Sequence, residues 1–263
     1  MNGIVDKGAG TPIVLIPGLQ GRWEWMRPTV DALARHYRVI TFSLCDERTS
    51  PFPCDPDKAF ENYIEQVELA LDRAHVDSAV IAGVSYGALI ATEFAARRPQ
   101  RVSRLVLANA LHRSWTPDSR QQRFLSAPRL MSPLFVATAP SRVKAEMKAA
   151  FPRIGERLRF MTKYGACVAF ALASPAKMAR RITWANEHRF ADVHAVKAPA
   201  LVVTGEPDLD KVVPVAVSCR YLDELDGAQH VVLKCTGHNG LITRPDDFAN
   251  VLGRFVDDVR LSA

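Results

Sequence analysis

Short apolar runs that alternate with helix-compatible stretches limit most strongly what this chain can fold into. Residues 13–16, 79–82, 105–108 and 200–204 are apolar almost throughout, which is typical of strands buried on both faces of a sheet. Helical spacing of apolar residues follows several of these runs, for example at Leu89, Ile90 and Phe94. The alternation predicts an α/β fold: a mostly parallel sheet covered on both faces by helices.

A Gly-x-Ser-x-Gly pentapeptide, residues 83–87, lies between the predicted strand at 79–82 and the predicted helix after it. Ser85 would then occupy a tight strand-to-helix turn, with its hydroxyl exposed at the sheet edge. Gly83 and Gly87 would let the helix pass close to neighbouring strands. Because serine and glycine are also common turn residues, the pattern indicates a nucleophile only if a base and an acid accompany it.

His238 is the candidate base. It lies in the segment Thr236-Gly-His-Asn-Gly240, directly after a predicted strand at 230–233, and so at the same sheet edge as Ser85. A lone histidine is more often structural than catalytic, but this position and its flanking glycines favour a role for His238. The other histidines end predicted helices, lie within a strand or lie in a region without strands: His36, His75, His112, His188, His194 and His230.

The candidate acid is Asp208, in the turn that follows the strand at 200–204. Asp210 is its competitor and Glu206 a weaker one, and Asp208 has a purely structural alternative as a stabiliser of its own turn. The strand at 105–108 is followed by Asn109 rather than by a carboxylate, so no acid is available there. The chain order serine, acid, histidine is the one expected for this strand arrangement.

These residues predict acyl transfer by a triad of Ser85, Asp208 and His238. His238 would accept the Ser85 proton, and Asp208 would fix the histidine tautomer and stabilise the imidazolium. The backbone amides of Tyr86 and Leu19 would hold the oxyanion, since Tyr86 begins a helix and Leu19 follows the first strong strand.

Several motifs together resemble the α/β-hydrolase fold family over nearly the whole chain. The similarity is to its serine branch of esterases, lactonases and carbon–carbon bond hydrolases. It implies that a helical insertion after the sixth strand acts as a cap over the pocket. The motifs are Ile16-Pro-Gly-Leu-Gln-Gly21, Gly83-Val-Ser-Tyr-Gly87, Arg97-Arg-Pro-Gln-Arg-Val102, Leu105-Val-Leu107, Gly205-Glu-Pro-Asp208 with Val213-Pro214, and Gly237-His238.

The alternation of predicted strands and helices is interrupted between residues 111 and 196. This stretch shows no convincing apolar strand, and its helix-compatible sequence is interrupted by prolines. We expect residues 1–110 and 197–263 to form the core domain and residues 111–196 to form the helical cap. Its prolines are Pro117, Pro128, Pro133, Pro140, Pro152 and Pro175.

Positive charge is concentrated in the same stretch. From His112 to His194 there are 15 lysines and arginines against 5 acidic residues, whereas the chain of 263 residues has a formal charge of +6. A solvated helical face is the simpler interpretation, and attraction of an anionic substrate or an acidic surface is the functional one. No motif that binds nucleic acid accompanies the charge.

Five dispersed cysteines without a Cys-x-x-Cys pair indicate free thiols rather than disulfides or a zinc site. No spacing of histidines and carboxylates suits a metal, and we expect no cofactor. No apolar run is long enough to span a membrane, and the first residues lack the pattern of a signal peptide. The expected location is therefore the cytoplasm.

The prediction from the sequence is hydrolysis of a small to medium carboxylic ester. Alternatives are a lactonase or carbon–carbon bond hydrolase on an anionic substrate, an acyltransferase or perhydrolase, and a non-catalytic ligand receptor on the same fold. Substrate-binding residues are not identifiable. Arginines of the expected cap would favour an anionic substrate if they point inward: Arg113, Arg120, Arg123 and Arg180. Apolar cap residues are expected mostly to pack the cap onto the core and partly to line the pocket: Trp115, Phe124, Leu130, Met131, Leu134, Phe135, Phe160, Met161, Phe170 and Trp184.

Overall fold

A seven-stranded sheet forms the centre of the computed structural model, which describes residues 3–169 and 171–257 without the side chains of residues 120, 132–137, 139 and 140. The strand order is β1-β3-β2-β4-β5-β6-β7, with β1 antiparallel to β3 and every other neighbouring pair parallel. The strands are β1 (Ile4–Lys7), β2 (Pro12–Ile16), β3 (Arg38–Phe42), β4 (Ala79–Val84), β5 (Val102–Ala108), β6 (Ala200–Thr204) and β7 (Gln229–Val232).

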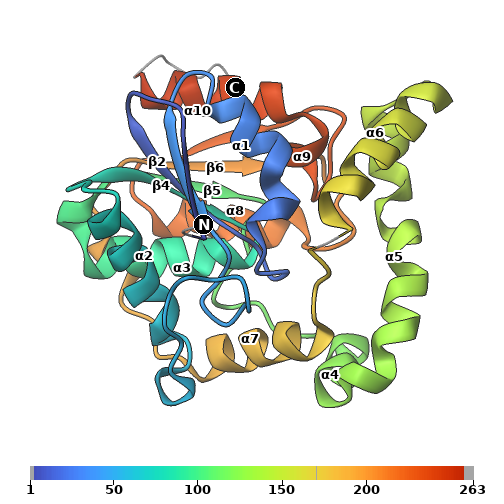
Figure 1. The fold of residues 1–263 in the computed structure, drawn as a ribbon, viewed down its shortest axis with the longest axis horizontal. Coiled ribbons are helices and arrows are strands. Elements are labelled where there is room, and N and C mark those ends of the chain that lie inside the picture. The colour runs from blue at the N-terminus through green and yellow to red at the C-terminus, as the bar shows by residue number, and fades with distance from the viewer. Residues whose placement is uncertain (1–2, 170, 258–263) are drawn as a thin grey trace.

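Helices cover both faces of this sheet, as the alternation in the sequence predicts (Figure 1). The helices outside the insertion are α1 (Arg27–Leu33), α2 (Glu61–Arg73), α3 (Tyr86–Arg97), α8 (Val215–Glu224), α9 (Gly240–Thr243) and α10 (Pro245–Val256). Short 3₁₀ segments are η1 (Trp23–Met26), η2 (Pro56–Lys58), η3 (Pro99–Arg101) and η4 (Val193–Ala195).

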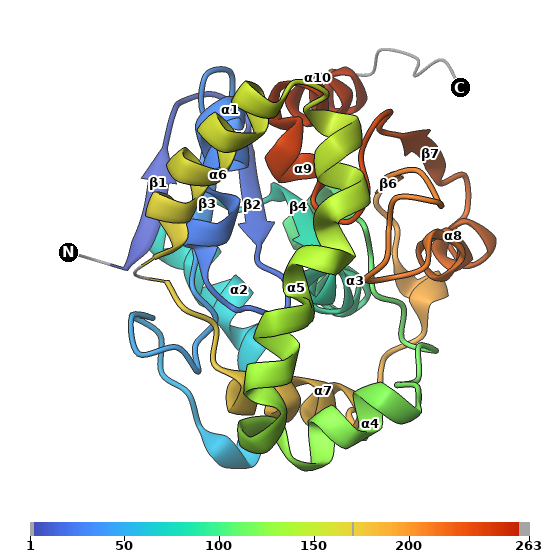
Figure 2. The ribbon, with the colours of Figure 1, turned by 90° about the vertical axis from the view of Figure 1, so that its right-hand side faces the viewer.

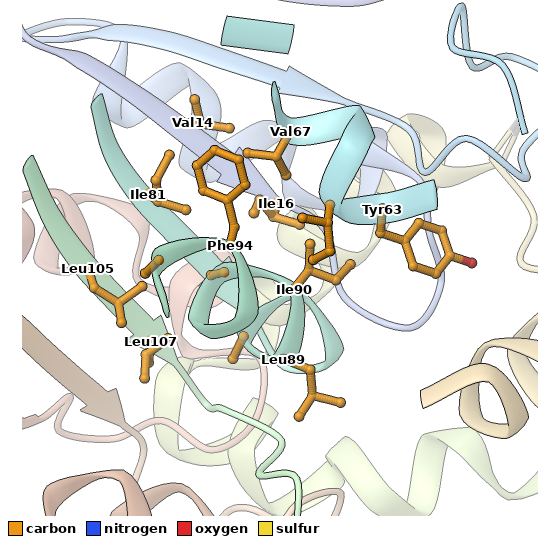
Figure 3. Packing of buried hydrophobic residues seen from close by; sticks show 14 of the residues in the cluster. Val14, Ile16, Tyr63, Val67, Ile81, Leu89, Ile90, Phe94, Leu105 and Leu107 are labelled. Atoms are coloured by element: carbon orange, nitrogen blue, oxygen red, sulfur yellow. The ribbon is translucent and has the colours of Figure 1, made fainter. Parts of the chain in front are cut away.

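Alternation along the strands divides the core into two apolar layers. Ile13 and Leu15 of β2 pack with residues of α1 and α10, whereas Val14 and Ile16 pack on the opposite face with α2 and α3. Figure 3 shows the second layer, where Phe94 of α3 lies among strand residues. These side chains are fully buried, because a parallel sheet covered on both faces exposes neither side of its central strands.

The stretch between β5 and β6, which we call the insertion (residues 111–196), is helical except for turns and linkers. Its helices are α4 (Ser119–Ser126), α5 (Pro128–Ala150), α6 (Ile154–Val168) and α7 (Pro175–Glu187). Figure 2 shows α5 and α6 in front of the strands and α4 and α7 below them. Pro128 and Pro175 occupy the first turns of their helices, where a proline costs no hydrogen bond. Pro133 and Pro140 lie inside α5, so the expectation that prolines interrupt the helical sequence is wrong at these two positions.

The insertion contacts the core at separate places. Tyr164 of α6 packs edge-on against Trp25 of η1, and its hydroxyl donates to the Trp25 carbonyl at 2.9 Å. The Trp25 indole in turn donates to the carbonyl of Ala171 at 2.7 Å. Helix α6 also exposes Ile154, Leu158 and Met161. The insertion is therefore less completely packed than the sheet and the helices that cover it.

Candidate active site

The turn between β4 and α3 holds Ser85 in a backbone conformation that residues with a side chain rarely adopt. Its φ is 53° and its ψ is −114°, which costs on the order of 1–3 kcal/mol. Neighbouring segments fix this turn: the Ser85 amide donates to Ala108 of β5 at 2.9 Å, and the Leu111 amide donates to the Ser85 carbonyl at 3.1 Å. The side chain is partly exposed at the carboxyl edge of the sheet, as predicted.

Both glycines of the pentapeptide are required by close backbone approach. A Cβ on Gly83 would collide with the backbone of Gly87, and a Cβ on Gly87 would lie 2.6 Å from the carbonyl oxygens of Ile16 and Pro17. Real Cβ atoms do not tolerate such contacts. The prediction that these glycines let α3 pass close to the strands is confirmed.

His238 lies beside Ser85, on the loop that follows β7. Its Nε2 is 3.2 Å from Ser85 Oγ, and its Nδ1 is 3.1 Å from Asp210 Oδ2. Because a carboxylate only accepts hydrogen bonds, we assign the proton of the neutral ring to Nδ1, which leaves Nε2 to accept from the serine hydroxyl. The Asn109 side chain donates to the His238 carbonyl at 2.9 Å and accepts from the Gly205 amide at 3.0 Å, so it ties the His238 loop to the end of β6.

The carboxylate beside His238 is that of Asp210 and not that of Asp208. Backbone hydrogen bonds from Leu209 and Asp210 to the Glu206 carbonyl close a turn that leaves Asp208 exposed at its apex. Asp210 follows the turn and is buried. Its Oδ1 accepts from the amides of Val212 and Val213 at 2.9 and 3.0 Å, which aims Oδ2 at His238. The predicted position of Asp208 is corrected accordingly, and its competitor takes the place beside the histidine.

Both predicted oxyanion donors lie close to Ser85. Tyr86 is the first residue of α3, where the amides have no helical partner. Gly18, the residue before Leu19, packs so close to the serine that a Cβ on it would lie 3.4 Å from Ser85 Cβ. Among the described residues, neither the Tyr86 nor the Leu19 amide donates to a protein acceptor. Neither N–H group is therefore occupied by another described part of the chain.

Arg181 of α7, which sequence reasoning did not single out, holds the Leu19 loop from the insertion. Its Nη1 donates to the Leu19 carbonyl at 2.7 Å, and its Nη2 lies 2.7 Å from Asp46 Oδ1 and 2.5 Å from Glu47 Oε1. The side chain is completely buried. Burial opposes its charge, but Asp46 and Glu47 outweigh this effect and raise the pKa of the guanidinium, so Arg181 stays protonated.

Gly21 makes room for this arginine. Its φ is 72°, and a Cβ on it would collide with the Arg181 guanidinium. Tyr86 contacts the backbone of the same arginine: its hydroxyl donates to the Arg181 carbonyl at 2.8 Å. The helix that carries Arg181 is thus connected to both segments that supply the candidate oxyanion amides.

Three of the four arginines that would favour an anionic substrate have other partners. Arg180 pairs with Asp46 at 3.0 Å, Arg113 pairs with Glu224 at 3.2 Å, and Arg123 donates to a carbonyl of its own helix. The side chain of Arg120 is outside the described part of the chain.

The apolar residues expected in the cap differ in exposure. Trp184 is buried against the core, Trp115, Phe124, Met131 and Phe160 are partly buried, and Leu130 and Met161 are exposed. The side chains of Leu134 and Phe135 and all of Phe170 lie outside the described residues.

Within the described ranges, no group of three or more histidines, cysteines and carboxylates is arranged to hold a metal ion. None of the described helices is long and apolar enough to cross a membrane.

A family model described as alpha/beta hydrolase fold matches residues 11–245. The chain belongs to the α/β-hydrolase fold family. This confirms both the predicted fold class and the resemblance in the sequence motifs. The enol-lactonase from Burkholderia xenovorans LB400 has a similar structure, with a TM-score of 0.76 at 23% identity, over 97% of this chain and 95% of that one.

Two enzymes are similar to this α/β-hydrolase in sequence. The 2-hydroxymuconate semialdehyde hydrolase of a Pseudomonas species (strain CF600) is 28% identical over 278 residues, which cover 98% of this chain and 91% of that protein. The 2-hydroxy-6-oxo-2,4-heptadienoate hydrolase of Pseudomonas putida is 27% identical over 261 residues, 95% of this chain and 91% of that one. The chain is an enzyme of the same fold, and its relatives are named as hydrolases.

Proposed function

We propose that this α/β-hydrolase cleaves small to medium carboxylic esters through an acyl-enzyme on Ser85. The observation that carries the proposal is the continuous hydrogen-bonded chain from Ser85 Oγ through His238 to Asp210, with the serine on a strained turn at the sheet edge. This is the arrangement that nucleophilic catalysis by a serine needs: a nucleophile, a base within hydrogen-bond reach and a group that orients the base.

In the proposed reaction, His238 Nε2 accepts the hydroxyl proton as Ser85 Oγ bonds to the ester carbonyl carbon. The amides of Tyr86 and Leu19 donate to the resulting oxyanion. When the tetrahedral intermediate collapses, the bond to the alkoxy group breaks and His238 returns the proton to it. Water then attacks the acyl-enzyme, giving a proton to His238, and collapse of this second intermediate releases the acid and restores the serine hydroxyl. Asp210 stabilises the imidazolium in both halves.

We further propose that residues 111–196 act as the cap and residues 1–110 and 197–263 as the core, with a small molecule bound between them. Contacts from the insertion to the Leu19 loop and to the loop of His238 support this division. The reaction as written needs no metal or organic cofactor, and it involves no nucleic acid. We also propose that the enzyme is cytoplasmic, where its free cysteines would stay reduced.

A second candidate is hydrolysis of a carbon–carbon bond in a dienoic acid, or of a lactone. Two relatives at 27% and 28% identity are named for the hydrolysis of such oxo-dienoates or semialdehydes, and this observation alone favours it. The ion pairs that occupy Arg113 and Arg180 do not support binding of an anion by these two residues.

The test is hydrolysis of p-nitrophenyl esters from acetate to decanoate by the wild type, Ser85→Ala and, as a matched control on an exposed serine of α4, Ser126→Ala. We expect turnover in the wild type and in Ser126→Ala, and loss of at least about 10⁴-fold in kcat for Ser85→Ala. Absence of ester turnover by the folded wild type contradicts the ester proposal.

The same proteins then receive a γ-lactone and a 2-hydroxy-6-oxo-dienoate, which separate the two parts of the second candidate. Product analysis with added alcohol or peroxide identifies an acyltransferase or perhydrolase. Binding without turnover of any of these compounds identifies a receptor.

A further inference from the structure

Glu146 of α5 is a fully buried carboxylate in an insertion that is otherwise rich in positive charge. Its carboxylate oxygens accept two contacts from the Asn239 backbone amide, at 2.9 and 3.1 Å, and one from the Asn239 side-chain amide at 3.0 Å. The partner residues are 93 positions apart in the chain, so this contact joins the insertion to the core.

Asn239 directly follows His238, so this contact from the insertion reaches the residue next to the candidate base. The His238 carbonyl is held from the core by Asn109 at 2.9 Å, and the next amide along the chain is held from the insertion by Glu146. The Asn239 carbonyl accepts from the amides of Ile242 and Thr243, at 2.8 and 2.9 Å, at the start of α9. The short segment that carries the imidazole is therefore fixed from three directions, and one of them is the insertion.

A carboxylate suits this contact better than any neutral side chain. Asn239 presents only donors to Glu146, and an ionised carboxylate presents only acceptors. Burial raises the pKa of Glu146, while the hydrogen bonds from Asn239 and the nearby imidazole of His238 act in the opposite direction. Burying a charge costs desolvation free energy. A purely apolar contact of α5 with the core would avoid this cost.

We propose that Glu146 is a positioning residue of the reaction. From the insertion it fixes the turn of His238 and Asn239, so that His238 Nε2 stays within hydrogen-bond distance of Ser85 Oγ while α5 is packed on the core. This inference rests on the proposed serine hydrolase. It makes the insertion part of the catalytic geometry in addition to its proposed role as a cap. Glu146 acts through Asn239 and is not placed in contact with the substrate.

The competing interpretation is that Glu146 only attaches the insertion. Other contacts do this at a distance from the histidine, and the Tyr164 hydroxyl on the Trp25 carbonyl is the best matched of them, since it also joins an insertion helix to the core by a hydrogen bond to backbone. Tyr164→Phe removes that bond and keeps the ring. It is therefore the control for Glu146→Gln, which keeps the size of the side chain but turns an NH₂ group toward the Asn239 donors.

Two measurements are made on wild type, Glu146→Gln and Tyr164→Phe. The first is kcat and KM for p-nitrophenyl butyrate, with Ser85→Ala in parallel. The second is hydrogen exchange at the Asn239 backbone amide, followed by NMR, which needs no substrate. We expect Glu146→Gln to lower kcat at least about 10-fold, with KM changed less than about threefold, because a small misplacement of a catalytic group is costly. Exchange at Asn239 should be at least about 10-fold faster, because two charged acceptor oxygens are replaced by one neutral acceptor and an NH₂ donor.

Tyr164→Phe should change neither quantity by more than about twofold. The inference is overturned if Glu146→Gln retains the wild-type kcat while turnover still depends on Ser85, or if both variants lower kcat equally. If the wild type shows no turnover that depends on Ser85, the proposed function fails instead. The exchange rate at Asn239 then decides the inference alone, and an unchanged rate overturns it.

Discussion

The core and the insertion contribute different kinds of contact to the surroundings of Ser85. Around Ser85 the core is a close-packed apolar interior, in which Phe94 of α3 and the strand residues beneath it are completely buried. The insertion exposes apolar side chains on α6 and packs Ile182 and Trp184 of α7 into the core. Its contacts with the loops of Leu19 and His238 are made by the charged residues Arg181 and Glu146. Apolar packing thus fixes the serine, and buried charges from the insertion hold the loops on either side of it.

The two kinds of contact differ in whether they fix the orientation of a group. Apolar contacts resist any displacement but specify little about orientation, whereas hydrogen bonds fix the direction of a donor and an acceptor. A strained turn such as that of Ser85 needs surroundings that fix it from many sides. In the proposed mechanism the Leu19 and His238 loops present an amide and an imidazole at defined angles, and the Arg181 guanidinium and the Glu146 carboxylate hold these loops by hydrogen bonds.

The largest expected effect tests which carboxylate orients His238. Asp210→Asn should lower kcat by about 10⁴-fold, because an amide nitrogen facing Nδ1 favours the wrong tautomer and removes the charge opposite the imidazolium. Asp208→Asn should leave kcat within about threefold, because Asp208 is exposed and the carboxylate beside His238 is that of Asp210. Steady-state kinetics on an active ester decide it, and equal losses in the two variants would contradict the assignment.

The second prediction concerns apolar packing. Phe94→Ala should lower the free energy of unfolding by about 4 kcal/mol, since it leaves a cavity under α3. Leu158→Ala on the exposed side of α6 should change it by less than about 0.5 kcal/mol. Urea unfolding gives both values. A large loss for Leu158→Ala would mean that the exposed side of α6 is covered in solution, and the contrast between the two regions would not hold.

The third prediction breaks the charged attachment at the Leu19 loop. Arg181→Met should lower the free energy of unfolding by about 3 kcal/mol, because Asp46 and Glu47 stay buried and lose the one partner that is completely buried with them, keeping only Arg180 and Lys177. Arg180→Met is the matched control in the same helix. Its side chain is half exposed, and its pair with Asp46 should be worth at most about 1 kcal/mol. A similar loss in both variants would show that the burial of Arg181 adds nothing.

The smallest effect concerns His112, at the junction of core and insertion. Its Nδ1 accepts from the Ser114 amide at 3.1 Å, and its Nε2 lies 3.1 Å from Glu224. Burial lowers the pKa of His112 in the folded state, although Glu224 acts in the opposite direction. Below the unfolded pKa of about 6.5 the unfolded chain therefore binds more protons, and stability falls as the pH drops further toward the folded pKa.

His112→Asn should flatten this dependence by on the order of 1 kcal/mol between pH 6.5 and 5. Urea unfolding at several pH values measures it. A residual slope is expected, because burial also lowers the pKa of His230. An unchanged slope would show that His112 does not contribute.

Sequence reasoning recovered the parts of the molecule that depend on local pattern. The apolar runs located the central strands within a few residues, and the glycines around Ser85 located the turn, because close approach of backbone leaves only glycine as a choice. Whether Asp208 or Asp210 faces the histidine depends on the turn that begins at Glu206 and on the two amides that orient Asp210. The residue types alone do not contain that geometry.

The charged contacts of the insertion were missed for a different reason. Arg181 is 135 positions from Asp46, and Glu146 is 93 positions from Asn239. Nothing in the spacing of a single sequence relates such pairs. The only signal was that Glu146 is one of few acidic residues in a basic stretch, which marks it as unusual but does not indicate a partner.

The close fit of Gly21 against the Arg181 guanidinium has a consequence for the evolution of the chain. Any side chain at position 21 would take the space of the guanidinium. Any smaller residue at position 181 would remove the fully buried counter-ion of Asp46 and Glu47 and leave them only the more exposed Arg180 and Lys177. A substitution at either position 21 or position 181 alone would therefore be unfavourable. The four residues should therefore be inherited or replaced together, and homologues that lack the glycine should also lack the arginine and at least one of the two acids.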